Sequence, residues 1–196
     1  MIKLLERYPA LTECRADIEK AAELLIETYA GGGKVLCCGN GGSASDSEHI
    51  VGELMKGFLL ARKVTDERIP EDLRDKLQGS LPAISLPSQT SVSSAFVNDC
   101  DPEMVYAQLV YGYAKEHDLL IAISTSGNSK NIVAAARVAK AVGIKVVALT
   151  GKKESKLSEI ADVCIKAPET ETYKVQEYHL PIYHYLCANT EAKFFN

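Results

Sequence analysis

Residues 34–53 read KVLCCGNGGSASDSEHIVGE, and the fold of this chain follows from this stretch. The apolar run 35–38 leads directly into a glycine-rich loop, 39–45, and the residues after the loop have the pattern of a helix. A strand, a small-residue loop and a helix N-terminus form an anion cradle, because free backbone N–H groups and the helix dipole converge there. His49 and Glu53 are four residues apart and share one helix face, so the stretch predicts a binding site with reactive groups beside it.

The overall composition is typical of one globular domain. The 196 residues are 46% apolar and 24% charged, and the net charge of −4 argues against a nucleic-acid binder. No apolar run approaches the ~20 residues that cross a bilayer, and the charged N-terminus lacks the core of a signal peptide. The six cysteines contain no C-x-x-C pair, which disfavours a disulfide framework or a cysteine zinc site and indicates the reducing cytoplasm.

Helical patterns separate the first apolar run from four others, at 81–86, 119–123, 144–149 and 163–166. Buried runs that alternate with helices predict a parallel sheet covered on both faces. We therefore expect a single domain over 1–196, a flavodoxin-like three-layer α/β/α sandwich with a five-stranded parallel sheet. The expected helices cover about 12–29, within an N-terminal helical segment 1–33, then 43–60, 88–98, 101–113, 131–142, 155–160 and 172–194, with the last interrupted at Pro181.

The run 119–123 is followed by a second loop of small residues, STSGNS at 124–129. Ser124, Thr125, Ser126 and Ser129 place four hydroxyls within six residues at the start of a helix. Hydroxyls and free N–H groups there suit a phosphate monoester without any lysine, although Ser and Asn are also common helix caps. Because the carboxyl ends of parallel strands meet at one edge of a sheet, the two loops predict a phosphorylated ligand with a polyol body.

The first loop also allows other interpretations. Residues 39–44, GNGGSA, match the dinucleotide fingerprint G-x-G-x-x-A. That fingerprint needs an acidic residue at the end of a second strand about 20 residues later, to hold a ribose. The sequence there is instead the most charged segment of the chain, a predicted insertion over 61–80. A nicotinamide cofactor is therefore disfavoured, and a tight turn without a ligand remains an alternative.

Five stretches carry a family resemblance: CGNGGSASDSEHIVGEL at 38–54, VND at 97–99, LLIAISTSGNSKNIV at 119–133, VVALTG at 146–151 and VQEYHLPIYHYL at 175–186. They resemble the sugar isomerase (SIS) domain family, and among its members they are most similar to phosphoheptose isomerases. The similarity covers about residues 12–190, with 61–80 as its main departure. It implies an SIS-type sandwich with additional N- and C-terminal helices.

The resemblance also implies a reaction and a set of site residues. The reaction is an aldose–ketose isomerisation of sedoheptulose 7-phosphate to D-glycero-D-manno-heptose 7-phosphate through an enediol(ate), with Glu53 as base and His184 as acid/base. In zinc-containing members the matching metal ligands are His49, Glu53, Gln176 and His184. The positions that match sugar-phosphate contacts are Asn40, Gly41, Gly42, Ser43, Asn98, Asp99, Ser124, Thr125, Ser126, Ser129 and Gln176.

This chemistry also has a physical basis in the residue types. Moving a proton between neighbouring carbons needs a poised base and a second group that relays protons between oxygens. A divalent ion polarises the carbonyl and stabilises the enediolate, and histidines with a glutamate make a plausible zinc ligand set. On one unbroken helix, however, Gln176 and His184 would be ~12 Å apart. Either Pro181 kinks the helix, or Gln176 precedes it, or the site is shared between subunits of a homo-oligomer, by resemblance a tetramer.

Other readings remain open. A non-catalytic SIS protein could bind a partner such as a replication initiator, although it would not need acid–base residues. A sugar-phosphate-sensing transcription regulator would need a DNA-binding domain, for which 196 residues leave no room. An isomerase of another sugar phosphate is a further alternative. We expect His179 to be structural, Lys56 and Arg62 to be solvated surface charges, and the insertion 61–80 to cover the pocket or a subunit contact.

Overall fold

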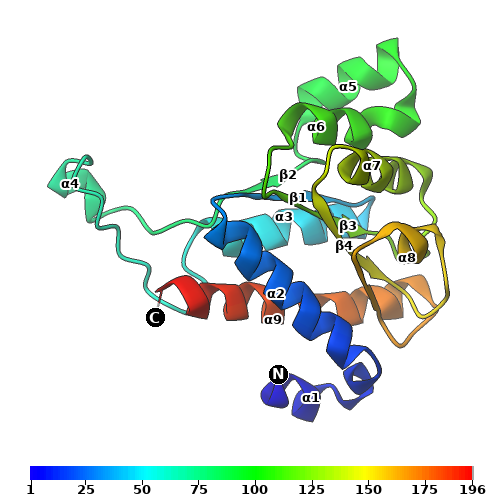
Figure 1. Ribbon diagram of the computed structural model, residues 1–196, viewed down its shortest axis with the longest axis horizontal. Coiled ribbons are helices and arrows are strands. Elements are labelled where there is room, and N and C mark those ends of the chain that lie inside the picture. The colour runs from blue at the N-terminus through cyan, green and yellow to red at the C-terminus, as the bar shows by residue number, and fades with distance from the viewer. Residues whose placement is uncertain (196) are drawn as a thin grey trace.

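The order of the strands sets the position of the site. A computed structural model describes residues 1–195, and within them five strands form one parallel sheet in the order β2-β1-β3-β4-β5 (Figure 1). In a sheet of this order the connections leave β1 and β3 in opposite directions, and ligands bind in the crevice outside the carboxyl ends of these two strands. The strands are β1 (Val35–Cys38), β2 (Ala83–Ser85), β3 (Leu119–Ile123), β4 (Lys145–Thr150) and β5 (Val163–Lys166).

The central strand β3 shows how the sheet is covered. All five of its residues are buried, and they alternate between two hydrophobic clusters. Leu119, Ile121 and Ile123 belong to the cluster on one face, whereas Leu120 and Ala122 belong to the cluster on the other. Successive side chains of a strand point to opposite faces, so a continuous apolar run requires a layer of helices on each side.

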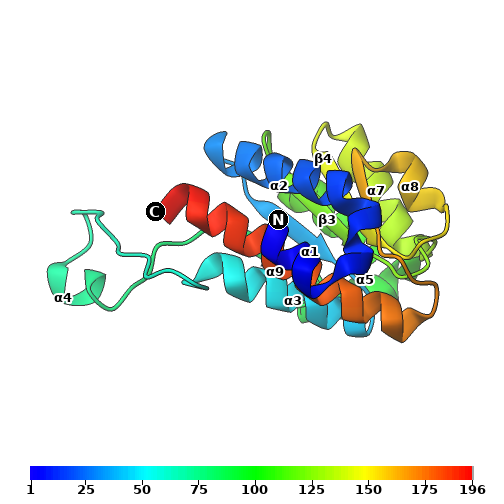
Figure 2. The same ribbon diagram turned by 90° about the horizontal axis from the view of Figure 1, so that it is seen from below.

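Helices supply these two layers. The first cluster lies under α2 (Arg15–Ala30), α3 (Gly42–Met55) and α9 (Thr172–Phe195), and Figures 1 and 2 show these three on one side of the sheet. The second cluster lies under α6 (Val105–Tyr113), α7 (Lys130–Ala141) and α8 (Lys156–Ile160), on the other face of the sheet. The predicted three-layer sandwich with a five-stranded parallel sheet is therefore confirmed. The remaining helical elements outside the insertion are α1 (Ile2–Arg7), η1 (Pro9–Cys14), α5 (Thr90–Asp99) and η2 (Pro102–Met104).

Helix α3 is shorter than the sequence pattern predicts. We expected it to reach residue 60, but it ends at Met55 and Lys56 is extended. The backbone N–H groups of Phe58, Leu59 and Leu60 do not continue the helix, because they donate to the carboxylate of Glu191 on α9. A side chain more than 130 residues further along the chain thus decides where α3 ends.

The charged insertion forms an arm, residues 63–78, that extends away from the sheet and contains the short helix α4 (Glu71–Arg74) (Figures 1 and 2). Its two ends meet where the N–H of Gly79 donates to the carbonyl of Arg62 over 2.7 Å. The arm points away from the sheet, and none of its residues lines the pocket beyond the ends of β1 and β3, contrary to one of our expectations. A contact with another subunit remains a prediction.

Helix α9 runs without interruption from Thr172 to Phe195, so the expected break at Pro181 is wrong. Proline lacks the N–H that would bond to the carbonyl four residues earlier, which belongs to Glu177. Glu177 is exposed, and water can satisfy its carbonyl. Over the described residues, no helix has the length and apolar character needed to cross a membrane.

Candidate active site

A pocket of about 350 Å³ opens beyond the carboxyl ends of β1 and β3. It lies where the strand order predicts a ligand, and it is bordered by both small-residue loops and by the first turns of α9. Most of the predicted substrate-contacting residues are among those that line it. The lining residues are Asn40, Gly41, Gly42, Ser43, Ile123, Ser124, Thr125, Ser129, Thr172 and Gln176.

The loop after β1 needs its glycines for two different reasons. Gly41 has a φ of +54°, which side chains disfavour, and it is the residue that turns the chain into α3. At Gly42 a Cβ atom would lie 2.6 Å from the Nε2 atom of Gln176, so the missing side chain lets α9 approach the loop. Asn40 is tied to the other side of the pocket, because its side-chain amide pairs with that of Asn131 at 2.9 Å in both directions.

The loop after β3 presents hydroxyls at the start of α7. The hydroxyls of Ser124 and Ser129 are 3.0 Å apart, and both residues line the pocket. Ser126 is exposed, lies outside the pocket lining and accepts a bond from the N–H of Asn128. Hydroxyls that face a helix N-terminus can bind a phosphate through neutral donors and the helix dipole. The geometry therefore suits the phosphate-binding role that we predicted for this loop.

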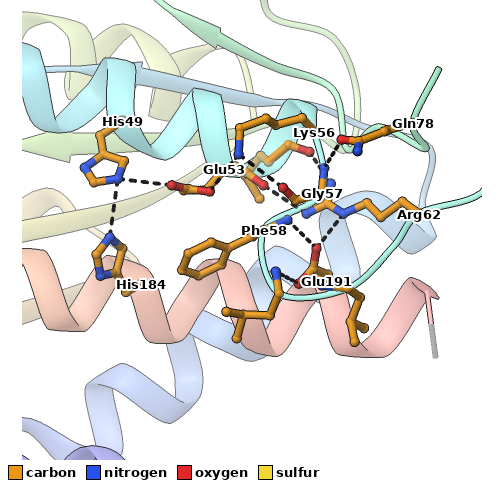
Figure 3. Close-up of polar contacts among 12 residues, drawn as sticks. His49, Glu53, Lys56, Gly57, Phe58, Arg62, Gln78, His184 and Glu191 are labelled. Carbon is orange, nitrogen blue, oxygen red and sulfur yellow. Dashed lines mark hydrogen bonds and ion pairs between the residues drawn. The ribbon is translucent and has the colours of Figure 1, made fainter. Parts of the chain in front are cut away.

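A second group of side chains lies between α3 and α9 (Figure 3). The Nε2 atom of His49 is 3.1 Å from Oε1 of Glu53 and 3.4 Å from Nε2 of His184. One ligand atom from each residue lies within 4.8 Å of the other two. His49 and Glu53 come from one face of α3, as predicted, and His184 reaches them from α9 of the same chain.

The three residues fit a zinc ion. Ligand atoms ~2.1 Å from a tetrahedral zinc lie about 3.4 Å from one another, close to the spacing between His49 and its two neighbours. The proton that Nε2 of His49 can carry gives a second argument for a bound cation. If Nε2 of His49 donates to Glu53, it cannot also accept from His184, so the two contacts compete. A shared cation would satisfy all three lone pairs together.

Two residues that the sequence did not single out orient His49. The Tyr183 hydroxyl lies 3.0 Å from Nδ1 of His49 and donates to Oδ1 of Asp46 over 3.2 Å. Burial raises the pKa of both the Tyr183 hydroxyl and the Asp46 carboxyl. Asp46 precedes His49 by three residues and therefore shares its helix face, a spacing from which its role could have been found.

His184 is partly shielded from water. Burial lowers its pKa, the neighbouring His49 lowers it further, and Glu53 opposes both effects. The ring of Phe58 lies 5.4 Å from the imidazole, centroid to centroid. The neutral form of His184 is therefore favoured, which suits either a metal ligand or a group that accepts a proton.

Other predicted site residues lie apart from this cluster. Gln176 borders the pocket beyond β1 and β3, two turns of α9 before His184, so in this chain it is not beside the histidines. Asn98 and Asp99 are exposed at the end of α5, where the Asn98 amide donates to Asp99, and they lie outside the pocket lining. His179 is fully buried and bonds through Nε2 to the carbonyl of Thr150 over 3.2 Å, which agrees with a structural histidine.

The family model of the SIS domain matches residues 3–151. This chain belongs to the SIS domain family. A phosphoheptose isomerase from Akkermansia muciniphila is 33% identical over 195 residues, which are 100% of this chain and 95% of that protein. One from Helicobacter pylori strain Shi470 is 39% identical over 176 residues, 90% of this chain and 83% of that protein.

A solved structure gives the same result for the fold. The phosphoheptose isomerase from Neisseria gonorrhoeae superposes with a TM-score of 0.78 at 29% identity, over 97% of this chain and 96% of the other. The resemblance inferred from the five stretches is therefore confirmed. The similarity to these relatives extends beyond the matched SIS residues into the C-terminal part of the chain, where α9 carries Gln176 and His184.

Proposed function

We propose that this SIS domain is an aldose–ketose isomerase that converts sedoheptulose 7-phosphate to D-glycero-D-manno-heptose 7-phosphate. The observation that carries the proposal is the convergence of Glu53, His49 and His184 next to a hydroxyl-lined pocket. Relatives that span the whole chain are phosphoheptose isomerases, which supports the choice of substrate.

In the proposed reaction Glu53 removes a proton from C1 of the ketose. The electron pair of the C1–H bond forms the C1–C2 double bond of an enediol(ate), while the oxygen on C2 gains a proton. Glu53 then returns its proton to C2, and the oxygen on C1 loses one to leave the aldehyde. His184 accepts and donates the protons that move between the two oxygens.

The remaining predicted residues would hold the substrate. The hydroxyls of Ser124, Thr125 and Ser129 would bind the phosphate at the N-terminus of α7, and Asn40–Ser43 with Gln176 would contact the polyol. His49, Glu53 and His184 would ligate zinc, which polarises the substrate carbonyl when bound. We assign Asn98, Asp99 and Ser126 to the substrate, and Gln176 to the zinc, on the family resemblance alone.

We further propose a cytoplasmic homotetramer with sites shared between subunits. Every residue of α5 is at least partly exposed, and Val92 and Val97 on this helix are 44% and 49% exposed. In the proposed assembly another chain would cover these residues. A neighbouring subunit could also bring Asn98 and Asp99 to a pocket.

The test is to measure turnover of sedoheptulose 7-phosphate by the purified wild-type protein and by the Glu53→Gln variant. Glutamine keeps the shape of the side chain but cannot act as a base. We expect the variant to lose about 10²–10⁴-fold in kcat, the usual contribution of a general base. Unchanged turnover would remove Glu53 from this role. A wild-type chain without isomerase activity that captures a replication initiator would favour the non-catalytic alternative.

A further inference from the structure

A buried ion pair joins α9 to the segment that follows α3, and these two helices carry the candidate acid–base residues. Nε of Arg62 donates to Oε1 of Glu191 over 2.8 Å, and both side chains are 0% exposed (Figure 3). The sequence placed Arg62 in a charged segment and predicted a solvated side chain, which is wrong. An ion pair removed from water needs further hydrogen bonds to offset the loss of hydration.

Glu191 has such bonds on both oxygens. Oε1 accepts from the N–H of Phe58 at 2.7 Å as well as from Arg62, and Oε2 accepts from Leu59 at 2.7 Å and Leu60 at 3.1 Å. Burial alone would raise the pKa of Glu191, but these donors outweigh it and hold the pKa below its usual range. The carboxylate is therefore charged, and it fixes the segment that follows α3.

Arg62 binds the end of α3 with its remaining nitrogens. Nη1 donates to the carbonyl of Leu54 over 2.6 Å, and Nη2 donates to the carbonyl of Glu53 over 2.9 Å. The last carbonyls of a helix lack intrahelical partners and carry the negative end of its dipole, so a guanidinium caps them well. One of these two carbonyls belongs to the proposed catalytic base itself.

The pair is also linked to His184. Glu191 follows His184 by seven residues, close to two helical turns, so both lie on the same face of α9. Phe58, whose N–H is bound by Glu191, places its ring 5.4 Å from the His184 ring. A single pair of side chains thus contacts the backbone of Glu53 and the segment that packs on His184.

We propose that Arg62 and Glu191 are positioning residues that set the placement of Glu53 and His184 relative to one another. The expected effect of these two residues on kcat rests on the proposed function, whereas their effect on the placement of Glu53 and His184 does not. A hydrophobic pair of similar size could hold the helices together. It could not donate to two carbonyls of α3 while accepting three N–H groups of the next segment.

The test compares Glu191→Gln with a matched control, Asp118→Asn. The Asp118 side chain is 2% exposed, pairs with Lys34 and accepts from the N–H groups of Lys34 and Lys115. It precedes β3, at the opposite end of the sheet from the pocket. Each variant exchanges one buried carboxylate for an amide of the same shape, so both should lower the Tm.

Only Glu191→Gln should change the site. We expect kcat for sedoheptulose 7-phosphate to fall about 10–100-fold with KM within about threefold, because misplacement of catalytic groups by about 1 Å can have an effect of this size. Zinc affinity should fall up to about tenfold, the lower end of the effect of losing a direct partner of a metal ligand, because Glu191 acts on Glu53 only through Arg62. The ring NMR signals of His49 and His184 should shift. Asp118→Asn should leave all three readouts at wild-type values.

The outcomes are separable. Glu191→Gln with wild-type kcat, zinc affinity and histidine signals would overturn the proposal, as would equal changes in Asp118→Asn. If Glu191→Gln does not fold, Arg62→Lys decides by the same readouts, since its ammonium can keep the pair but cannot reach both carbonyls. If the wild type does not isomerise the sugar, the proposed function fails, and the histidine signals alone still decide the positioning role.

Discussion

The two halves of the candidate site are built differently. The pocket beyond β1 and β3 is made largely of consecutive residues that follow these two strands, so the sheet places them as soon as it forms. The His49–Glu53–His184 cluster joins side chains whose positions differ by as much as 135 residues, and it exists only because α3 and α9 pack together. One half is local and the other depends on long-range packing.

This difference predicts how each half fails. In the proposed reaction the pocket contacts a phosphate that is present in the substrate and in the transition state alike, so changes in the pocket should raise KM. The cluster is proposed to act on the reacting carbons, so changes in the cluster should lower kcat. Steady-state kinetics can therefore test the difference between the two halves, because pocket variants should change KM and cluster variants should change kcat.

The largest effect is expected from His184→Asn. Loss of a general acid/base typically costs 10²–10⁴-fold in rate, and we expect this loss in kcat with little change in KM. His117→Asn is the matched control, since the His117 side chain is 56% exposed and asparagine tolerates its φ of +68°. Steady-state kinetics with sedoheptulose 7-phosphate gives both constants. A rise in KM alone would place His184 in substrate binding instead.

The same contrast explains what the sequence could predict. Two strands, β1 and β3, begin and end where their apolar runs do, because a strand buried on both faces leaves a continuous pattern. The bounds of β5 also match the prediction, although only alternate residues of this edge strand are buried. The loop residues Asn40–Ser43 and Ser124 follow from those strands. The spacing of His49 and Glu53 followed from helix geometry alone. Each of these features is decided by neighbours in the sequence.

The features that were missed depend on distant partners. Arg62 lies in a charged segment, and nothing local distinguishes it from a solvated arginine; only Glu191 explains its burial. The end of α3 at Met55 has the same cause. Pro181 was expected to break α9, but the carbonyl it leaves without a partner belongs to an exposed residue, so the helix continues.

The next effect concerns His179, which lies on α9 between Gln176 of the pocket and His184 of the cluster and bonds to the end of β4. Burial lowers its pKa to about 4 in the folded protein. Between pH ~6.5 and ~4 the unfolded chain binds a proton that the folded chain does not. The free energy of unfolding should therefore decrease by about 3 kcal/mol as the pH is lowered through this range. Urea unfolding at pH 7 and pH 4.5 measures this. His179→Gln, which can still donate to Thr150, should lack this part of the loss.

A smaller effect is expected in the pocket from Ser124→Ala. A hydrogen bond to a charged group contributes about 1.5–3 kcal/mol, so KM should rise about 10–100-fold while kcat stays near its wild-type value. Ser158→Ala is the control, because it removes the same hydroxyl from the capping box of α8, outside the pocket. A fall in kcat for Ser124→Ala would contradict the division between the two halves.

The smallest effect is expected at Gly42, where the loop after β1 approaches α9 within the pocket. An added Cβ would lie 2.6 Å from Nε2 of Gln176, the far end of a flexible side chain that can move aside. Gly42→Ala should therefore change stability by less than about 1 kcal/mol, since alanine also favours the first turn of α3. Gly41→Ala, at a φ of +54°, should instead cost about 1–3 kcal/mol. If Gln176 contacts the sugar, Gly42→Ala should also raise KM severalfold without lowering kcat. Equal stability losses in the two variants, measured by urea unfolding, would mean that Gln176 cannot move and that the contact between loop and helix is rigid.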